Sequence, residues 1–205
     1  MSAAREEILR RVRAATAGSP PADPVVREYR RAGGGAPVEL FAERVADYRA
    51  EILLTAPGAI KVRAAIERAL AAHGAVRIGV PPGLPPEWRP ATVDVVEDDG
   101  LSPRELDALD GVVTGCTVGI AETGTIVLAA GPAEGRRALT LVPDLHVCVV
   151  REEQIVELVP EAFAALAAYS RRPLTFVSGP SATSDIELSR VEGVHGPRRL
   201  VVVIA

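Results

Sequence analysis

From residue 51 onward, short apolar runs alternate with segments of helical periodicity, and no other feature of the sequence restricts the fold as much. Short continuous apolar runs are typical of strands that are buried on both faces of a sheet, and the helices between them cover those faces. We therefore expect an α/β fold with a largely parallel sheet flanked by helices. Residues 110–130 are apolar but broken by glycines, which predicts two or three strands there, some of them antiparallel.

The periodicity also places the individual elements along the chain. Helices are expected at 3–15, 37–50, 57–74, 102–109 and 159–170, and strands at 51–54, 75–80, 91–96, 145–150, 174–179 and 198–205. Ser102 is the expected N-cap of one helix, with Glu105 at the capping-box position, and Gly74 suits the C-terminal end of another.

The first 36 residues differ in composition from the rest. After the helix at 3–15, the stretches GSPPADP and RRAGGGAP are rich in glycine and proline and are typical of linkers. We therefore expect residues 1–36 to form an N-terminal helix and linker arm, and residues 37–205 to form a single α/β domain.

Several classes of site are excluded by what the sequence lacks. Lys61 is its only lysine, so the Gly-Lys-Ser/Thr end of a P-loop is missing. No GxGxxG fingerprint marks a dinucleotide site, because Gly33–Gly35 lacks the strand before and the helix after it. Cys116 and Cys148 form no CxxC pair, which excludes an iron–sulfur cluster or a thiolate zinc site within one chain. We expect both thiols to be inert core groups, and we expect no cofactor and no metal site in this chain.

Charge and hydropathy bear on partners and location. The formal net charge of −4 argues against non-specific binding of nucleic acid. No apolar run approaches the roughly 18 to 20 residues of a membrane span. The N-terminal segment is charged throughout and has no apolar signal core, so we expect a cytoplasmic protein.

Two polar clusters follow expected strands. The first is AETGT at 121–125, and the second extends from SGPSATSDIE at 178–187 to the GVHGP motif around His195. Ligands of open α/β sheets collect at the carboxyl ends of strands. If Thr183 or Ser184 caps a short helix, its free N–H groups could bind a phosphate or carboxylate. The glycines beside His195 permit close approach of the backbone, and its imidazole can carry a proton or contact an anion.

Each cluster also has a purely structural explanation. SGPSATSD is typical of a turn followed by a helix N-cap, and His195 can be a hydrogen-bonded turn residue. A lone glutamate at a strand end, such as Glu122, is usually solvated. Asp185 and Glu187 are two residues apart and would not share a helix face, so they make a weak metal pair. His146 enters a strand and is expected to be mainly structural.

The order and spacing of AETGTIVL, PDLHVCVV, SGPSATSDIE and GVHGPRRLVVVI resemble the LUD-domain family, from about residue 38 to the end. The resemblance implies a fold similar to ribose-phosphate isomerases, sugar-phosphate deaminases and CoA-transferases. It also implies action with two iron–sulfur lactate utilization proteins in the oxidation of L-lactate to pyruvate. Because this chain has only two cysteines, the electron-carrying clusters are expected in those partners.

Together, the motifs predict a pocket for a small carboxylate or phosphate, with one motif on each side. Glu122 and His195 are the candidate catalytic residues, as groups that could handle a proton. The candidate ligand-binding residues are Thr123, Gly124, Thr125, Ser178, Gly179, Pro180, Ser181, Thr183, Ser184, Asp185, Glu187 and Gly196.

Three functions remain open from the sequence, because an α/β fold hosts unrelated chemistries. The favoured one is a subunit without iron–sulfur clusters in a lactate-oxidising system, binding a small anion. The alternative is an independent enzyme of sugar-phosphate isomerase or CoA-transferase type, for which Glu122 could supply a nucleophile. The third is a structural or regulatory binding module. Whether the chain is itself catalytic is not decided by its residues.

Overall fold

The computed structural model describes residues 3–18, 24–35, 37–183, 191–192 and 195–205. Within these ranges, no helix combines the length and the apolar character that crossing a membrane requires.

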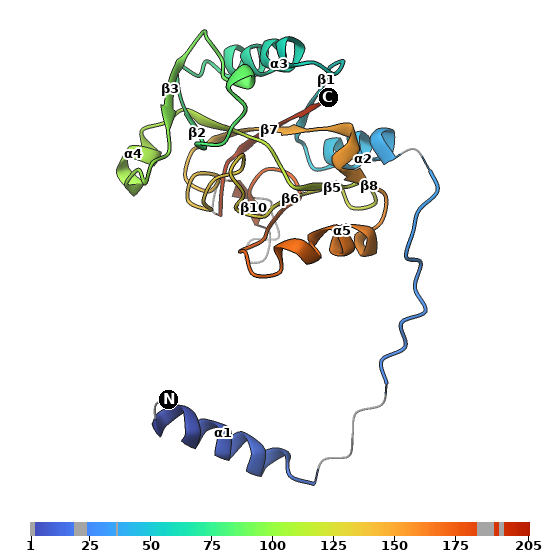
Figure 1. The fold of residues 1–205 in the computed structure, drawn as a ribbon. Helices are drawn as coiled ribbons and strands as arrows, with labels where there is room; N and C mark the ends of the chain where they lie inside the picture. Colours follow the sequence, from blue (N-terminus) through green and yellow to red (C-terminus); the bar gives the residue numbers. More distant parts are fainter. Residues whose placement is uncertain (1–2, 19–23, 36, 184–190, 193–194) are drawn as a thin grey trace.

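The centre of the molecule is a six-stranded sheet in which all neighbouring strands run parallel (Figure 1). In spatial order its strands are β1 (Glu51–Leu54), β12 (Arg199–Ile204), β7 (Leu145–Val150), β4 (Gly111–Thr114), β2 (Arg77–Val80) and β3 (Asp94–Glu97). The central strands β12, β7 and β4 are buried almost throughout, because elements on both faces cover them. The predicted α/β fold with a largely parallel sheet is confirmed.

A smaller four-stranded sheet lies against one face of this main sheet. Its order is β8 (Ile155–Val156), β5 (Val118–Ile120), β6 (Thr125–Leu128) and β9 (Thr175–Val177). β6 is antiparallel to both of its neighbours, whereas β8 is parallel to β5. The antiparallel pairing expected within 110–130 is therefore present between β5 and β6, while β4 of the same stretch belongs to the main sheet.

The helices complete four layers (Figure 1). They are α1 (Ala3–Thr16), α2 (Pro37–Asp47), α3 (Ala59–Ala72), α4 (Pro103–Asp107) and α5 (Val159–Leu166), with 3-10 turns η1 (Pro86–Trp88), η2 (Glu152–Gln154) and η3 (Ala167–Tyr169). The apolar side of α3, including Leu70, packs on one face of the main sheet. Phe41 and Val45 of α2 pack with the small sheet on the other face, and α5 covers the outer face of the small sheet.

Local rules account for several element ends. The expected capping box is present, since the Ser102 side chain accepts from the Glu105 N–H and the Glu105 carboxylate accepts from the Ser102 N–H. Gly74 follows α3 with φ at 66°, the left-handed conformation that ends helices. The helix expected over 159–170 is α-helical only to Leu166 and ends in η3.

The N-terminal segment stands apart from the layers. α1 buries none of its residues, and residues 24–35 form an extended stretch that approaches the domain (Figure 1). The glycine run fastens this stretch, because the N–H groups of Gly34 and Gly35 donate to the Glu157 carboxylate at 2.9 and 2.7 Å. The division into an arm to residue 36 and a domain from residue 37 stays a prediction.

Candidate functional site

The two sequence motifs meet at the small sheet. β6 begins at Thr125, the last residue of AETGT, and pairs with β9, which leads into SGPS. The Thr125 and Ser178 hydroxyl oxygens lie 2.8 Å apart, and the Thr123 hydroxyl donates to that of Thr125 over 2.8 Å. The strand pairing therefore brings together residues that are 53 positions apart in the sequence.

The second motif folds back on itself as a hairpin. The Ser181 N–H donates to the Pro197 carbonyl over 2.8 Å, and the His195 N–H donates to the Ser181 hydroxyl over 2.9 Å. Beyond this closure, β10 (Ala182–Thr183) pairs with β11 (Val191–Glu192) in antiparallel fashion. Thr183 thus lies at the end of a strand, and the residues of the helix that it was expected to cap lie outside the described residues. Ser184, Asp185 and Glu187 lie outside the described residues.

A cavity of about 260 Å³ opens beside this hairpin, between the two sheets. The hairpin provides Ser178–Ser181 and His195–Pro197, β9 provides Thr175–Val177, and the facing wall consists of Arg137, Thr140, Leu141, His146 and Leu200. His146 and Leu200 are near the starts of β7 and β12, so the cavity lies at the amino ends of these main-sheet strands. The expected position at carboxyl strand ends holds only for β9.

The polar lining of this cavity suits a small anion. Arg137 contributes a guanidinium group, His195 an imidazole, and Ser178, Ser181 and Thr140 contribute hydroxyls. Guanidinium and hydroxyl groups bind carboxylates and phosphates through charge-assisted hydrogen bonds. We call this the motif cavity.

The structure places Glu122 outside the lining of the motif cavity. It occupies the turn between β5 and β6, where its N–H donates to the Glu157 carbonyl over 2.9 Å. Its half-exposed carboxylate is 3.6 Å from the Arg30 guanidinium. Glu122 and His195 are therefore not brought together in one cavity, and AETGT meets the second motif only through its threonines.

The glycines of both motifs are pressed against the end of α2 and the residues after it. Gly124 has φ of 57°, and a Cβ there would be 2.7 Å from the Arg44 carbonyl carbon. Gly179 has φ of 84°, and a Cβ there would be 2.4 Å from the Tyr48 Cβ. Both contacts explain a glycine on structural grounds, without a ligand.

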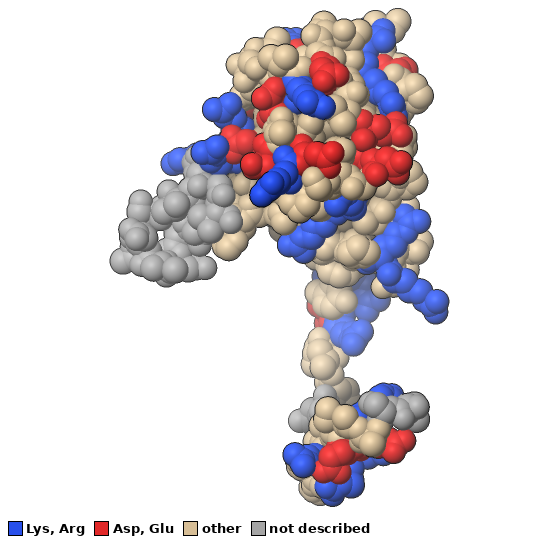
Figure 2. All heavy atoms as spheres, turned by 90° about the vertical axis from the view of Figure 1, so that its left-hand side faces the viewer, with Lys and Arg blue, Asp and Glu red and all other residues tan. Residues whose placement is uncertain are grey.

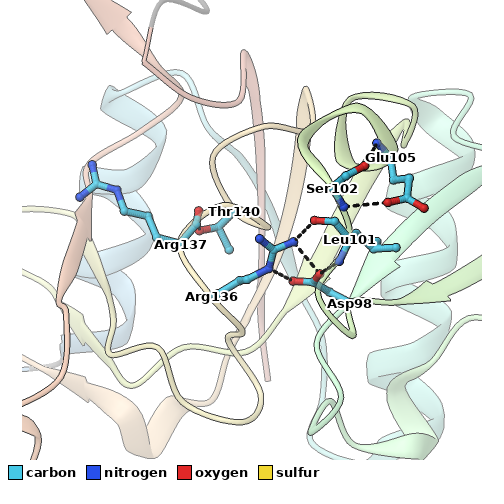
Figure 3. A network of polar contacts seen from close by, with 7 residues as sticks. All are labelled: Asp98, Leu101, Ser102, Glu105, Arg136, Arg137 and Thr140. Atoms are coloured by element: carbon cyan, nitrogen blue, oxygen red, sulfur yellow. Dashed lines mark hydrogen bonds and ion pairs between the residues drawn. The ribbon is translucent and has the colours of Figure 1, made fainter.

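Arg137 owes its position to its neighbour Arg136. Arg136 donates to both carboxylate oxygens of Asp98 at 2.8 Å and also to the Leu101 carbonyl, and the Leu101 N–H donates to Asp98 over 3.0 Å. Figure 3 shows Arg136 and Arg137 extending in opposite directions, the first to Asp98 and the second away from this network. The two adjacent arginines therefore connect the wall of the motif cavity, through Arg137, to the end of β3, through Arg136.

This contact belongs to a larger charged edge. Arg77 of β2 pairs with Asp94 of β3 at 3.3 Å, and Arg89 pairs with Glu97 at 2.6 Å. Figure 2 shows acidic and basic side chains interspersed on the side of the molecule where β3 and α4 lie in Figure 1. Of these three ion-paired carboxylates, Asp98 is the buried one, with 1% of its side chain exposed.

His146 and the cysteines form a buried polar contact behind the motif cavity. The Thr114 hydroxyl is 2.8 Å from His146 Nε2, and both thiols are buried. The interaction between the two neighbouring thiols raises the pKa of Cys116, as does burial, and lowers the pKa of Cys148. His146 thus has the structural contact that was expected and also reaches the cavity.

Across the ranges that the structure describes, no group of three or more His, Cys, Asp or Glu residues is arranged to hold a metal ion.

Sequence reasoning missed Arg137, Thr140 and His146 as site residues. The only local signal for the first was the arginine pair itself, Arg136–Arg137, which directly follows Gly135. Thr140 and His146 carry no signal of their own, because their place in the cavity depends on the packing of the two sheets.

Comparison with known proteins gives consistent relatives. A family model described as LUD domain matches residues 50–205. Lactate utilization protein C of Deinococcus radiodurans is 53% identical over 167 residues, which cover 80% of this chain and 77% of that protein. Lactate utilization protein C of a Geobacillus species is 28% identical over 128 residues, covering 58% of this chain and about half, 53%, of the relative. The crystal structure of a DUF162 family protein from Deinococcus radiodurans superposes with a TM-score of 0.71 at 45% identity, covering 82% of this chain and 95% of that one.

Proposed function

The chain belongs to the LUD domain family, and from this membership we propose that it serves lactate utilization as a small-anion-binding subunit. In this role it acts with two iron–sulfur partner proteins in the oxidation of L-lactate to pyruvate. The chain has two cysteines and no CxxC pair, so the partners carry the clusters that take up the electrons. The observation that carries the anion-binding part is the motif cavity, whose lining combines Arg137 with the serines of the SGPS segment.

The dimensions and chemistry of the motif cavity favour a molecule of lactate or pyruvate size. Its volume of about 260 Å³ is below the roughly 300–1,000 Å³ of pockets for drug-sized ligands. A carboxylate can accept hydrogen bonds from the Arg137 guanidinium, and the adjacent oxygen can bond with Ser178, Ser181 or Thr140. His195 supplies an exposed imidazole to this lining and is the proposed proton-handling group, whereas His146 is buried.

A binding titration tests the cavity directly. We expect pyruvate and L-lactate to bind the isolated chain, and Arg137→Gln to weaken that binding by about tenfold or more, because charge-assisted hydrogen bonds contribute about 1.5–3 kcal/mol. Isothermal titration calorimetry at low salt, with inorganic phosphate as a competitor, measures the effect. Arg77→Gln is the matched control, since Arg77 lies on the edge formed by β2 and β3. Equal affinities in the two variants, or no binding to the unchanged chain, would contradict the anion site.

Turnover by the reconstituted system tests the role in lactate oxidation. We expect anaerobic lactate oxidation by the two iron–sulfur partners, followed with an artificial electron acceptor, to require this chain. His195→Ala should lower the rate by about tenfold or more if it handles a proton, since positioned acid–base groups contribute about 10²–10⁴-fold. Glu122→Gln should have a smaller effect, because Glu122 lies outside the cavity lining. Full turnover by the partners alone would remove the proposal, and sugar-phosphate or CoA-ester activity of the isolated chain would favour the independent enzyme.

A further inference from the structure

Two larger cavities adjoin the opposite end of the main sheet. The chain runs from β2 to β3 on one side of β2 and returns to β4 on its other side, so the strand order reverses between β2 and β4. Open α/β sheets bind ligands at such a point, outside the carboxyl ends of the strands. Cavities of about 610 and 510 Å³ lie there, beside the residues that follow β2, β4 and β7. Both are lined by Gly131, Pro132 and Arg172, and we call them together the switch-point crevice.

The polar groups of this crevice are mostly engaged within the protein. Glu134 accepts hydrogen bonds from the Thr117 hydroxyl and from the N–H groups of Ala129 and Gly131. Arg151 pairs with Glu153 at 3.1 Å. Arg151 and Glu153 therefore neutralise each other, and the acceptor oxygens of Glu134 are occupied by donors of the protein itself.

Arg172 differs from the other charged residues of the crevice. Its guanidinium lies over the Tyr169 ring, 5.4 Å from the ring centroid. Among the residues that the structure describes, no carboxylate is within ion-pair distance of it. Stacking holds the guanidinium plane while leaving its edge donors available to an oxyanion. Around it the 510 Å³ cavity is lined mainly by apolar groups, including Pro82, Pro132 and Pro173, whereas the 610 Å³ cavity has polar and apolar groups in similar measure.

We infer that the switch-point crevice binds an organic ligand with one acidic group and a largely apolar body. The acidic group of the ligand forms an ion pair with Arg172, and its apolar body packs along Pro82, Pro132 and Pro173. The volume of each cavity is in the range of sites for ligands of cofactor size, whereas the motif cavity is smaller, and the apolar lining of the 510 Å³ cavity suits the body of such a ligand. Arg172 calls for one acidic group, because Arg151 is paired with Glu153, Arg136 is paired with Asp98, and the Glu134 carboxylate is engaged by three neutral hydrogen-bond donors. This inference does not depend on the proposed role in lactate oxidation.

The fluorescent probe 8-anilinonaphthalene-1-sulfonate tests this inference, since it has one sulfonate and an aromatic body. We expect saturable binding of one molecule per chain in a fluorescence titration of the full chain. Arg172→Gln should weaken it by about tenfold, because the oxyanion loses its charge-assisted bonds. Tyr169→Phe keeps the ring under Arg172 and should leave the affinity within about twofold. Arg137→Gln, in the motif cavity, should also leave it unchanged. Thermal unfolding of each variant checks that it is folded.

The probe also binds exposed aromatic surface, and the described part of the chain includes a pair of such side chains. Phe163 and Phe176 stack with ring centroids 6.1 Å apart and are 56% and 46% exposed. Loss of binding in Phe176→Ser with full binding in Arg172→Gln would overturn the inference, as would absence of saturable binding. Loss in Arg172→Gln with full binding in Phe176→Ser and Arg137→Gln is the result that supports it.

Discussion

Replacing Asp98 by asparagine is expected to lower the free energy of unfolding by about 2 kcal/mol at neutral pH. The Asp98 side chain is 1% exposed and receives two hydrogen bonds from Arg136 and one from the Leu101 N–H. Breaking a buried ion pair by removing one charge costs about 3–5 kcal/mol, and less here because the Arg136 side chain is 43% exposed. Urea unfolding followed by circular dichroism measures the change.

The same substitution should change the response of stability to acid. Burial alone would raise the pKa of Asp98, but the hydrogen bonds from Arg136 and the Leu101 N–H hold it below its ordinary value. The unfolded chain therefore binds the proton more readily than the folded one between these two pKa values. The stabilisation is fully present above an ordinary aspartate pKa of about 3.9 and is lost as the pH falls through the lower folded value. The difference between the unchanged chain and Asp98→Asn should shrink below about pH 4.

Asp94→Asn is the matched control for Asp98→Asn. It removes a carboxylate from the same edge of the sheet, but the Asp94–Arg77 pair is more than half exposed on both sides and should contribute little. Asp98→Asn should in addition speed backbone hydrogen exchange in residues 131–141, because Arg136 fastens this segment to β3. Equal losses of stability in the two variants, with unchanged exchange, would show that the pair does not hold the cavity wall.

Much of the fold follows from local patterns. The Val-rich runs that became β7 and β12 are buried on both faces, so their composition alone indicates central strands. The division into two sheets does not follow, because pairing partners lie far apart in sequence. β8 is only two residues long and lies beside β5 through a parallel contact, so no period in the sequence marks it. β9, expected as a longer buried strand, is a short edge strand with Phe176 exposed.

The candidate site could likewise be predicted only where local patterns mark it. The contact between Thr125 and Ser178 could be predicted from the sequence, since both motifs end or begin at strands. The opposite wall was not, because Arg137 sits in a stretch without helix or strand period between β6 and β7. Its place is set by the contact of Arg136 with Asp98, 38 residues earlier, and by the closeness of the two sheets. Tertiary contacts of this kind leave no periodic signal.

Gly179→Ala is expected to lower the free energy of unfolding by about 3 kcal/mol. The backbone has φ of 84°, where an L side chain costs about 1–2 kcal/mol. The new methyl group would also be 2.4 Å from the Tyr48 Cβ and 3.0 Å from its carbonyl oxygen, and such overpacking costs about 1–3 kcal/mol. Gly124→Ala should behave similarly, since its Cβ would be 2.7 Å from the Arg44 backbone. Urea unfolding of both variants measures these losses.

Gly100→Ala separates the two causes. Gly100 has the same φ of 84°, but a Cβ there would meet nothing within 4 Å, so only the cost of about 1–2 kcal/mol for the left-handed conformation should remain. The excess loss in Gly179→Ala is then the contact with Tyr48. If Gly179→Ala instead matches Gly100→Ala in stability but no longer binds pyruvate, the contact with Tyr48 yields at little cost. Binding would then require the backbone position that glycine permits at residue 179, because the new methyl group points at Tyr48, which does not line the cavity. If stability falls as expected and binding persists in the folded fraction, the glycine serves to seat the motif on the end of α2.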